Sequence, residues 1–167
     1  MIEDNGLLPG IIERLEGTPV RIHYKTVKMG KEMVLPVSAT QWSIKKEIGH
    51  LSDLEPLWFE RVEQLVNNIP ELSAADMTNV KTHEAPHDEK PLLELSEGFF
   101  HARMQLVSKL RSLTDEDLEK KSLHPRLKIQ MRIVDLAYFV AEHDDHHLAQ
   151  ITFLINSDKS RMDQHVL

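Results

Sequence analysis

The pattern of hydrophobic and polar positions along the chain predicts four long helices. The clearest covers residues 136–154, where apolar residues recur at spacings of three and four, as they do on one face of a helix. Similar stripes cover residues 43–66 and residues 92–113, and a less regular one covers residues 7–29. The fold class is therefore predicted to be all-α, with one domain over residues 1–167.

Prolines interrupt two of these stripes. Gly17 and Pro19 fall inside the first, so the pattern allows two short helices or one broken helix. Pro56 falls inside the second, on the side away from the apolar stripe. We expect it to bend that helix without interrupting the packing of its apolar face.

The remaining residues form three connections. Residues 30–41 and 114–131 are the shorter two, and residues 66–91 form a long crossover between the second and third helices. The long connection contains His83 and His87 in the spacing H-E-x-x-H of zinc proteases. Because Pro86 lies between these histidines and no apolar stripe surrounds them, we interpret this stretch as a loop.

Composition and charge narrow the possible partners. The chain has 41% hydrophobic and 28% charged residues, as in ordinary soluble proteins, and a net charge of −7. This negative charge argues against nucleic acid or an anionic membrane surface as the main partner. No apolar run approaches the roughly 18 residues of a membrane span, and the N-terminus does not resemble a secretion signal. A cytoplasmic location is therefore expected.

Two histidines provide the candidate chemistry. His143 and His147 lie one helical turn apart, in the middle of the apolar stripe that should face the core. Buried imidazoles need polar partners, since an unpaired buried polar group costs about 1–3 kcal/mol. A metal ion would satisfy both if a third ligand came from elsewhere, but core histidines with other partners fit the pattern equally well. The chain has no cysteine, so a metal would need His, Asp, Glu or water.

Other polar residues are less informative by themselves. His50 lies at the shoulder of the second stripe and, taken alone, is more typical of a half-buried or solvent-facing histidine. Arg103 lies on the core-facing side of the third stripe. It could meet a buried carboxylate or an anionic ligand, although extension to the bundle edge is commoner. Asp144 and Asp145 are interpreted as solvated charges or as partners of a ligand histidine, and His146 as such a partner or a surface residue.

Three segments together resemble a known family. They are WSIKKEIGHLSDLE (residues 42–55), LHPRL (123–127) and AEHDDHHLAQI (141–151). In order and spacing they are similar to the DinB-like superfamily of bacterial metal-binding four-helix bundles, which includes the DNA-damage-inducible DinB proteins and the YfiT-like hydrolases. The resemblance implies a bundle of DinB/YfiT type.

The same resemblance implies a metal site. The family's triad, one histidine on the second helix and an H-x-x-x-H pair on the last, corresponds here to His50, His143 and His147. It also implies zinc, nickel or iron as the metal, and a homodimer. Characterised relatives include thiol-dependent S-transferases and a maleylpyruvate isomerase.

These expectations lead to a functional hypothesis. Three histidines leave an open fourth position, as in catalytic zinc sites. We therefore expect a metal-dependent enzyme acting on a small molecule, either a thiol S-transferase or a hydrolase. A thiol would have to arrive as a low-molecular-weight cosubstrate, because the chain has none.

The alternatives are a metal- or ligand-binding stress-response bundle without catalysis, and a purely structural bundle. Several residues could orient a ligand histidine, with Gln150 the best placed: Asp53, Glu55, Glu142, Asp144 and Gln150.

Overall fold

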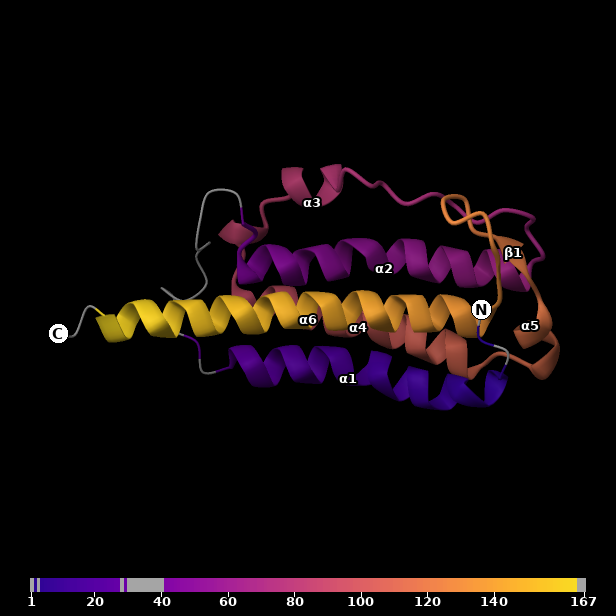
Figure 1. Cartoon of the computed structure of the whole chain (residues 1–167), viewed down its shortest axis with the longest axis horizontal. Helices are drawn as coiled ribbons and strands as arrows, with labels where there is room; N and C mark the ends of the chain where they lie inside the picture. Colours follow the sequence, from indigo (N-terminus) through magenta and orange to yellow (C-terminus); the bar gives the residue numbers. More distant parts are fainter. Residues whose placement is uncertain (1, 3, 28, 30–40, 165–167) are drawn as a thin grey trace.

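Four long helices in the described part of the chain form a bundle (Figure 1). The computed structural model describes residue 2, residues 4–27, residue 29 and residues 41–164, with side chains described as far as residue 157. The bundle helices are α1 (Leu8–Thr26), α2 (Ile44–Val66), α4 (Leu92–Arg111) and α6 (Ile133–Gln164). The all-α prediction is confirmed. The connection predicted over residues 30–41 lies outside the described residues, apart from residue 41.

Each bundle helix packs against two others. α2 contacts α4 and α6, and α1 contacts the same two helices from the opposite corner. Figure 1 shows all four helices along the long axis of the molecule. A search of the described residues for a helix with the length and hydropathy of a membrane span finds none.

α1 is one continuous helix, although it contains Pro19. Proline has no N–H, so the carbonyl four residues earlier, that of Leu15, loses its partner within the helix. Arg103 on α4 donates to this Leu15 carbonyl at 3.3 Å. A side chain from the neighbouring helix thus satisfies the acceptor that the proline leaves free.

α2 begins and ends as its sequence indicates. The Ser43 hydroxyl accepts from the Lys46 N–H at 3.0 Å and caps the helix, and Asn68, with φ of 56°, follows its last turn. Pro56 lies inside the helix on the exposed side, while Trp58 and Val62 remain buried. The core-facing stripe therefore continues past the proline, as expected.

The connection between α2 and α4 contains two short helical segments. These are α3 (Val80–Glu84) and the 3-10 helix η3 (His87–Glu89), both of which contact α2. The sequence predicted no regular structure here, because five-residue segments are too short to show a period. Ala85 is extended between the two segments, so His83 and His87 do not share one continuous helix. The rejection of the H-E-x-x-H pattern agrees with this geometry.

Between α4 and α6 the chain forms a small helix and a hairpin. α5 (Asp115–Glu119) is followed by β1 (Ser122–Leu123) and β2 (Gln130–Met131), which pair antiparallel. Leu123 also forms a parallel bridge with Glu71, which joins this connection to the one after α2. The sequence predicted a plain connection over 114–131. Strands of two residues are too short for a period-2 pattern, and they leave the fold class unchanged. A further 3-10 turn, η1 (Asn5–Leu7), precedes α1.

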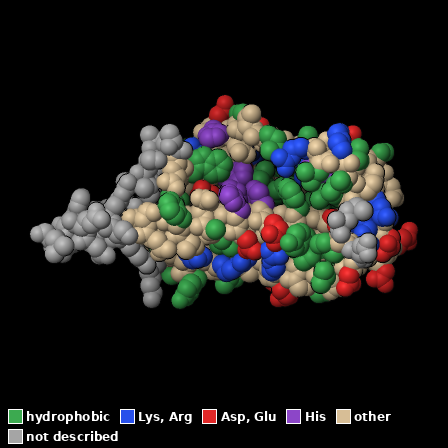
Figure 2. All heavy atoms as spheres, in the orientation of Figure 1, with side chains coloured by type: hydrophobic (Ala, Val, Ile, Leu, Met, Phe, Trp, Pro, Cys, Tyr) green, Lys and Arg blue, Asp and Glu red, His purple; other side chains and the backbone are tan. Residues whose placement is uncertain are grey.

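The hydrophobic core consists of two clusters separated by a polar layer. One cluster surrounds Trp58 and Leu106, and the other surrounds Ile48 and Phe99. Each bundle helix contributes polar residues between the two clusters, and these include Thr18, His50, Glu55, Arg103, His143, Asp144 and His147. Figure 2 shows histidine side chains near the middle of the bundle, at the level of this layer.

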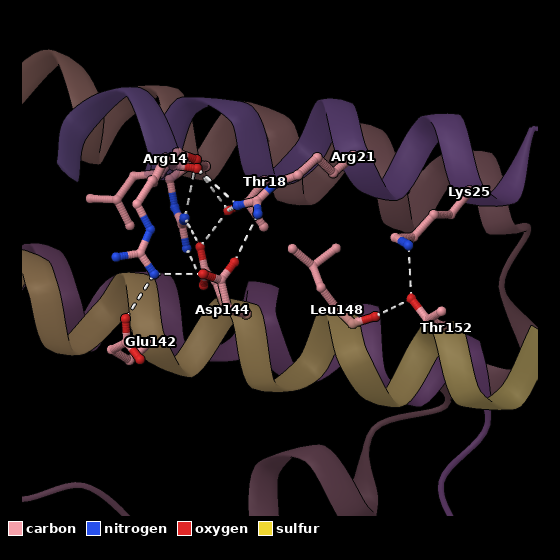
Figure 3. Close-up of polar contacts among 11 residues, drawn as sticks. Arg14, Thr18, Arg21, Lys25, Glu142, Asp144, Leu148 and Thr152 are labelled. Atoms are coloured by element: carbon pink, nitrogen blue, oxygen red, sulfur yellow. Dashed lines mark hydrogen bonds and ion pairs between the residues drawn. The ribbon is translucent and has the colours of Figure 1, made fainter. Parts of the chain in front are cut away.

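Arg103 is the centre of the polar layer. Its Nε and Nη2 donate to Glu55 Oε1 at 3.0 and 2.6 Å, and its Nη1 and Nη2 donate to the two oxygens of Asp144. Thr18 donates to Asp144 at 2.7 Å, as Figure 3 shows. Arg103 is fully buried, so the expectation that it extends to the bundle edge is wrong. Its long side chain finds two carboxylates in the interior instead.

The two neighbouring aspartates differ in environment. Asp144 is fully buried, so its interpretation as a solvated charge is wrong. It also makes no hydrogen bond to His143 or His147, because its partners are Arg103 and Thr18. Asp145 is half-buried and accepts from Arg14 at 2.5 Å and from Arg21 at 2.8 Å. Adjacent helical positions point about 100° apart, which puts one aspartate inside the bundle and the other at the α1–α6 boundary.

Replacing Arg103 with methionine should strongly destabilise the protein. The substitution keeps most of the side-chain volume but leaves the buried carboxylates of Glu55 and Asp144 without a cation. We expect a loss of about 3–5 kcal/mol in the free energy of unfolding, measured by urea denaturation. Arg111→Met is the matched control on the same helix. Its ion pairs with Glu13 and Glu16 are exposed and screened by solvent, so the loss of stability should be much smaller than that of Arg103→Met. Equal losses in the two variants would contradict a central role for Arg103.

Candidate metal centre

Three imidazole nitrogens converge where α2 faces α6. His143 Nε2 lies 3.3 Å from His50 Nε2 and 3.2 Å from His147 Nε2. One ligand atom from each histidine lies within 4.8 Å of the other two. Zinc bound tetrahedrally at 2.0–2.1 Å per nitrogen would separate neighbouring nitrogens by about 3.3 Å. The observed spacing of the two pairs fits such an ion.

Glu47 fixes the orientation of His147. The Nδ1 of His147 donates to Glu47 Oε2 at 2.6 Å, and both residues are buried. With the proton on Nδ1, the neutral ring has its lone pair on Nε2, which faces the other two histidines. A carboxylate behind a histidine is a common arrangement in metal sites, because it fixes the tautomer and makes the ring a better ligand.

Thr82, in the connection between α2 and α4, fixes the orientation and tautomer of His50. The Thr82 hydroxyl donates to Asp53 at 3.0 Å, so it accepts from His50 Nδ1, 3.1 Å away. Asp53 also accepts from His87 Nε2 at 2.9 Å. A Cβ atom at Gly49 would lie 2.4 Å from the His87 ring, so only glycine allows this close approach. These contacts attach α3 and η3 to the helix that carries His50.

The two fixed tautomers leave more lone pairs than protons at the centre. Nε2 of His50 and Nε2 of His147 are both acceptors, and His143 Nε2 could supply at most one hydrogen. Burial lowers the pKa of His143 to about 3. Burial, followed by the charge of His147, lowers that of His50 to about 4. Both rings are therefore neutral at pH 7, the form that binds a metal, and a divalent cation would satisfy all three nitrogens at once.

A cavity of about 640 Å³ lies beside the three histidines. The ring of Trp42 is 5.0 Å from His50 and stacks on His147 at 6.3 Å, while Trp58 packs edge-on against His143 at 5.7 Å. Figure 2 shows hydrophobic side chains around the central histidines, with Lys or Arg side chains further along the same face. The volume falls within the range of pockets that hold small molecules.

The structure brings the three predicted histidines together. The burial of His50 differs from what its position on the helix indicates when it is considered alone. His50 is buried, not half-buried or solvent-facing, because its ring turns in from the stripe shoulder toward α6. His146 is exposed, so of its two interpretations the surface residue applies. Gln150 lines the cavity without a hydrogen bond to a ligand histidine.

Sequence reasoning missed the direct partners of the three candidate ligand histidines. Glu47 precedes His50 by three residues and so shares its helix face, and this spacing is the signal that could have identified it. Thr82 had no such signal, because it lies in a polar connection. Of the predicted partners, Asp53 acts only through Thr82, while Glu55 and Asp144 bind Arg103 and Glu142 binds Arg14.

The comparisons with known proteins agree with this geometry. Residues 18–151 match the family model described as the DinB superfamily. The chain belongs to the DinB superfamily. Among solved structures, YfiT from Bacillus subtilis is 18% identical, with a TM-score of 0.81 over 95% of this chain and 91% of that one. YfiT is described as "a probable metal-dependent hydrolase with an unusual four-helix bundle topology". At this identity the likeness shows that the two proteins share a fold. No curated protein matches the chain.

Removing His143 should abolish metal binding. His143 Nε2 is the atom that approaches both other nitrogens, so His143→Ala leaves no three-nitrogen site. Loss of residues that merely orient ligands weakens metal binding about 10–100-fold, so we expect more than about 100-fold here. Zinc affinity is measured by competition with a chromophoric chelator. His146→Ala, which removes an exposed histidine from the same turn, should bind zinc like the unmodified chain. Full occupancy of His143→Ala would refute the assignment of the ligands.

The metal-free protein should lose stability as the pH falls below about 6.5. Because His50 and His143 have lowered pKa values in the folded state, the unfolded chain binds more protons between pH 6.5 and about 4. Each histidine should lower the free energy of unfolding by up to about 1.4 kcal/mol per pH unit in this window. Urea denaturation of chelator-treated protein at pH 7.5, 6 and 5 measures the slope. His143→Gln should give a shallower slope, and an unchanged slope would count against this explanation.

Proposed function

We propose that this chain is a metal-dependent enzyme that hydrolyses a small molecule in the cavity beside His50, His143 and His147. The observation that carries the proposal is the convergence of three Nε2 atoms at the wall of a 640 Å³ cavity, two of them fixed as acceptors. YfiT, which shares the fold, is described as a probable metal-dependent hydrolase, and this supports the same class of reaction.

The three histidines would hold a divalent metal, with zinc, nickel and iron as the candidates. A metal held by three protein ligands with an open position acts as a Lewis acid, which polarises a substrate oxygen and lowers the pKa of water. Glu47 and Thr82 would keep His147 and His50 in the tautomers that this role requires. Trp42 and Trp58 would limit the access of solvent to the ligand rings.

Glu47 is also the candidate proton acceptor. Its Oε2 is engaged with His147, but its Oε1 has no hydrogen bond to a described residue, and the side chain lines the cavity. The sequence pattern alone does not identify a carboxylate that is placed to act as this base. A carboxylate at this position can accept a proton from a nucleophile in the cavity, a contribution typically worth about 10²–10⁴-fold in rate.

Thiol S-transfer is the second candidate. The chain has no cysteine, and the cavity is large enough to admit a low-molecular-weight thiol beside an electrophile. In this reaction the thiol replaces water as the nucleophile, and Glu47 would accept the thiol proton. A homodimer also remains a prediction, which light scattering of the purified protein would test.

Turnover by the metal-loaded protein tests the proposal. We expect hydrolysis of some members of a panel of esters, amides and lactones in water alone. Glu47→Gln, assayed at saturating metal, should lower kcat by about 10²-fold and flatten the acidic limb of the pH profile. His147→Ala should be inactive, whereas His101→Ala, an exposed change on α4, should leave the rate unchanged.

The alternative outcomes are distinct. Turnover that requires added glutathione or a similar thiol would replace hydrolysis with S-transfer. Retention of the metal without turnover under either condition would refute the enzyme and leave a metal-binding bundle. Equal rates for the unmodified chain and His147→Ala would refute any role of the three-histidine site.

A further inference from the structure

The end of the cavity away from the histidines contains a buried cation without a carboxylate partner. Arg61 on α2 is 1% exposed, and its Nε and Nη2 both donate to the Ser73 carbonyl, at 2.9 and 2.7 Å. Nη1 makes no hydrogen bond to a described residue, and no carboxylate of the described chain forms an ion pair with this guanidinium. Burial lowers the pKa of Arg61, which shows the cost of a charge in this environment. A buried charge usually has a directly bonded counter-charge, but Arg61 has none among the described residues, and the charge of Glu60 raises its pKa by less than burial lowers it.

His124 places an unpaired donor at the same end. Its Nδ1 accepts from the backbone N–H groups of Arg126 and Leu127, at 3.2 and 3.1 Å, within the turn that follows β1. The proton of the neutral ring is therefore on Nε2. Nε2 is buried and has no partner among the described residues, although the side chain is 3% exposed and lines the cavity. An unsatisfied buried donor costs about 1–3 kcal/mol, which a ligand acceptor would recover.

Arg126 adds a second cation. Its side chain is exposed, lines the cavity and forms no ion pair with any residue that the structure describes. After burial, the charges of Arg61 and Arg126 are the next causes that lower the pKa of His124, and Arg126 also affects Arg61, so the three groups lie close together. Asp76 lines the cavity too, but its carboxylate accepts from Thr78 and Val80 in its own turn.

An aromatic wall joins this end to the three histidines. The Arg61 Cζ atom lies 5.3 Å from the centroid of the Trp58 ring, whose edge contact with His143 is 5.7 Å. Phe139 continues the wall, at 6.0 Å from Trp58 and 6.0 Å from His124. One indole ring therefore separates the unpaired cation from a ligand histidine. Aromatic walls of this kind pack against apolar or flat ligands.

We propose that Arg61, His124 and Arg126 bind the anionic group, a carboxylate or phosphate, of a small organic substrate. The apolar or aromatic body of this substrate would lie along Trp58 and Phe139, which places its reacting bond at the three histidines. The substrate class is thus an organic anion with its charge at the end remote from the reaction. This inference rests on the proposed function for the identity of the ligand as a substrate, but anion binding itself does not require turnover.

Calorimetric titration with three probes of one shape tests the proposal. Phenylacetate and phenyl phosphate carry the anionic group and phenylacetamide does not, and each is titrated into zinc-loaded and into chelator-treated protein. We expect at least one anion to bind both forms, about tenfold or more tightly than the amide. The preferred anion identifies the group as a carboxylate or a phosphate. Binding that requires zinc would place the anion at the metal and overturn the proposal.

Matched variants test whether His124 and Arg126 bind the anion or only stabilise the turn that contains them. In His124→Asn the side-chain oxygen can still accept from the turn, as Nδ1 does, but the Nε2 donor is lost. Arg126→Gln removes an exposed cation, and Lys128→Gln makes the same charge change in the same turn at a residue outside the cavity lining. The first two variants should bind the anion about tenfold more weakly, and the Lys128 variant within about twofold of the unmodified chain. Near-equal affinities for all three variants would refute the site.

The two proposals fail in distinguishable ways. Anion binding without turnover of any substrate would refute the enzyme while leaving the anion site in place. Turnover that does not discriminate between anionic and neutral substrates, with kcat/KM unchanged in His124→Asn, would refute the anion site while leaving the enzyme.

Discussion

Arg103 is a buried cation that contacts the other three helices of the bundle. It donates to Glu55 on α2, to Asp144 on α6 and to the Leu15 carbonyl that Pro19 leaves free on α1. Taking these charges out of water is costly, so their net contribution to stability is small. Their contribution to register is larger, because sliding α2, α4 or α6 by one turn would leave a buried charge unpaired. The cluster thereby fixes the register of α2 relative to α6 along the bundle axis.

The candidate metal centre depends on the register of α2 and α6. Asp144 lies between His143 and His147 in sequence, and Glu55 lies slightly more than one turn beyond His50. Once Arg103 holds both carboxylates, the three histidines face one another across the same layer. Glu47 and Thr82 then set the protonated nitrogens of two rings. The polar layer between the two hydrophobic clusters therefore both fixes the register of the helices and forms the candidate metal site.

The cavity has different chemistry at its two ends. Three imidazoles with converging ring nitrogens occupy one end and favour a cation, while Arg61, Arg126 and the Nε2 donor of His124 occupy the other and favour an anion. Aromatic rings join the ends. Such a cavity orients an elongated ligand in one direction, since reversing the ligand would place its charge beside the wrong end.

The sequence by itself determined the four long helices and the helix face on which His143 and His147 lie. A period near 3.6 is a local property, so the stripes over 43–66, 92–113 and 136–154 were readable, as was the pair His143 and His147. The family resemblance added His50 to this pair. The helix through Pro19 was left open, since its continuity depends on how its neighbours satisfy the freed carbonyl.

Only the tertiary structure decided which polar groups meet. Arg103 and Asp144 are 41 residues apart in the sequence, and Thr82 is 32 residues from His50. No local pattern encodes such pairs, because a buried charge and a solvated one can look alike on a helix face. Their partners are set by helix packing and by the connections that cover it. The same reason explains why the donor of His124 became visible only when the turn around its Nδ1 was known.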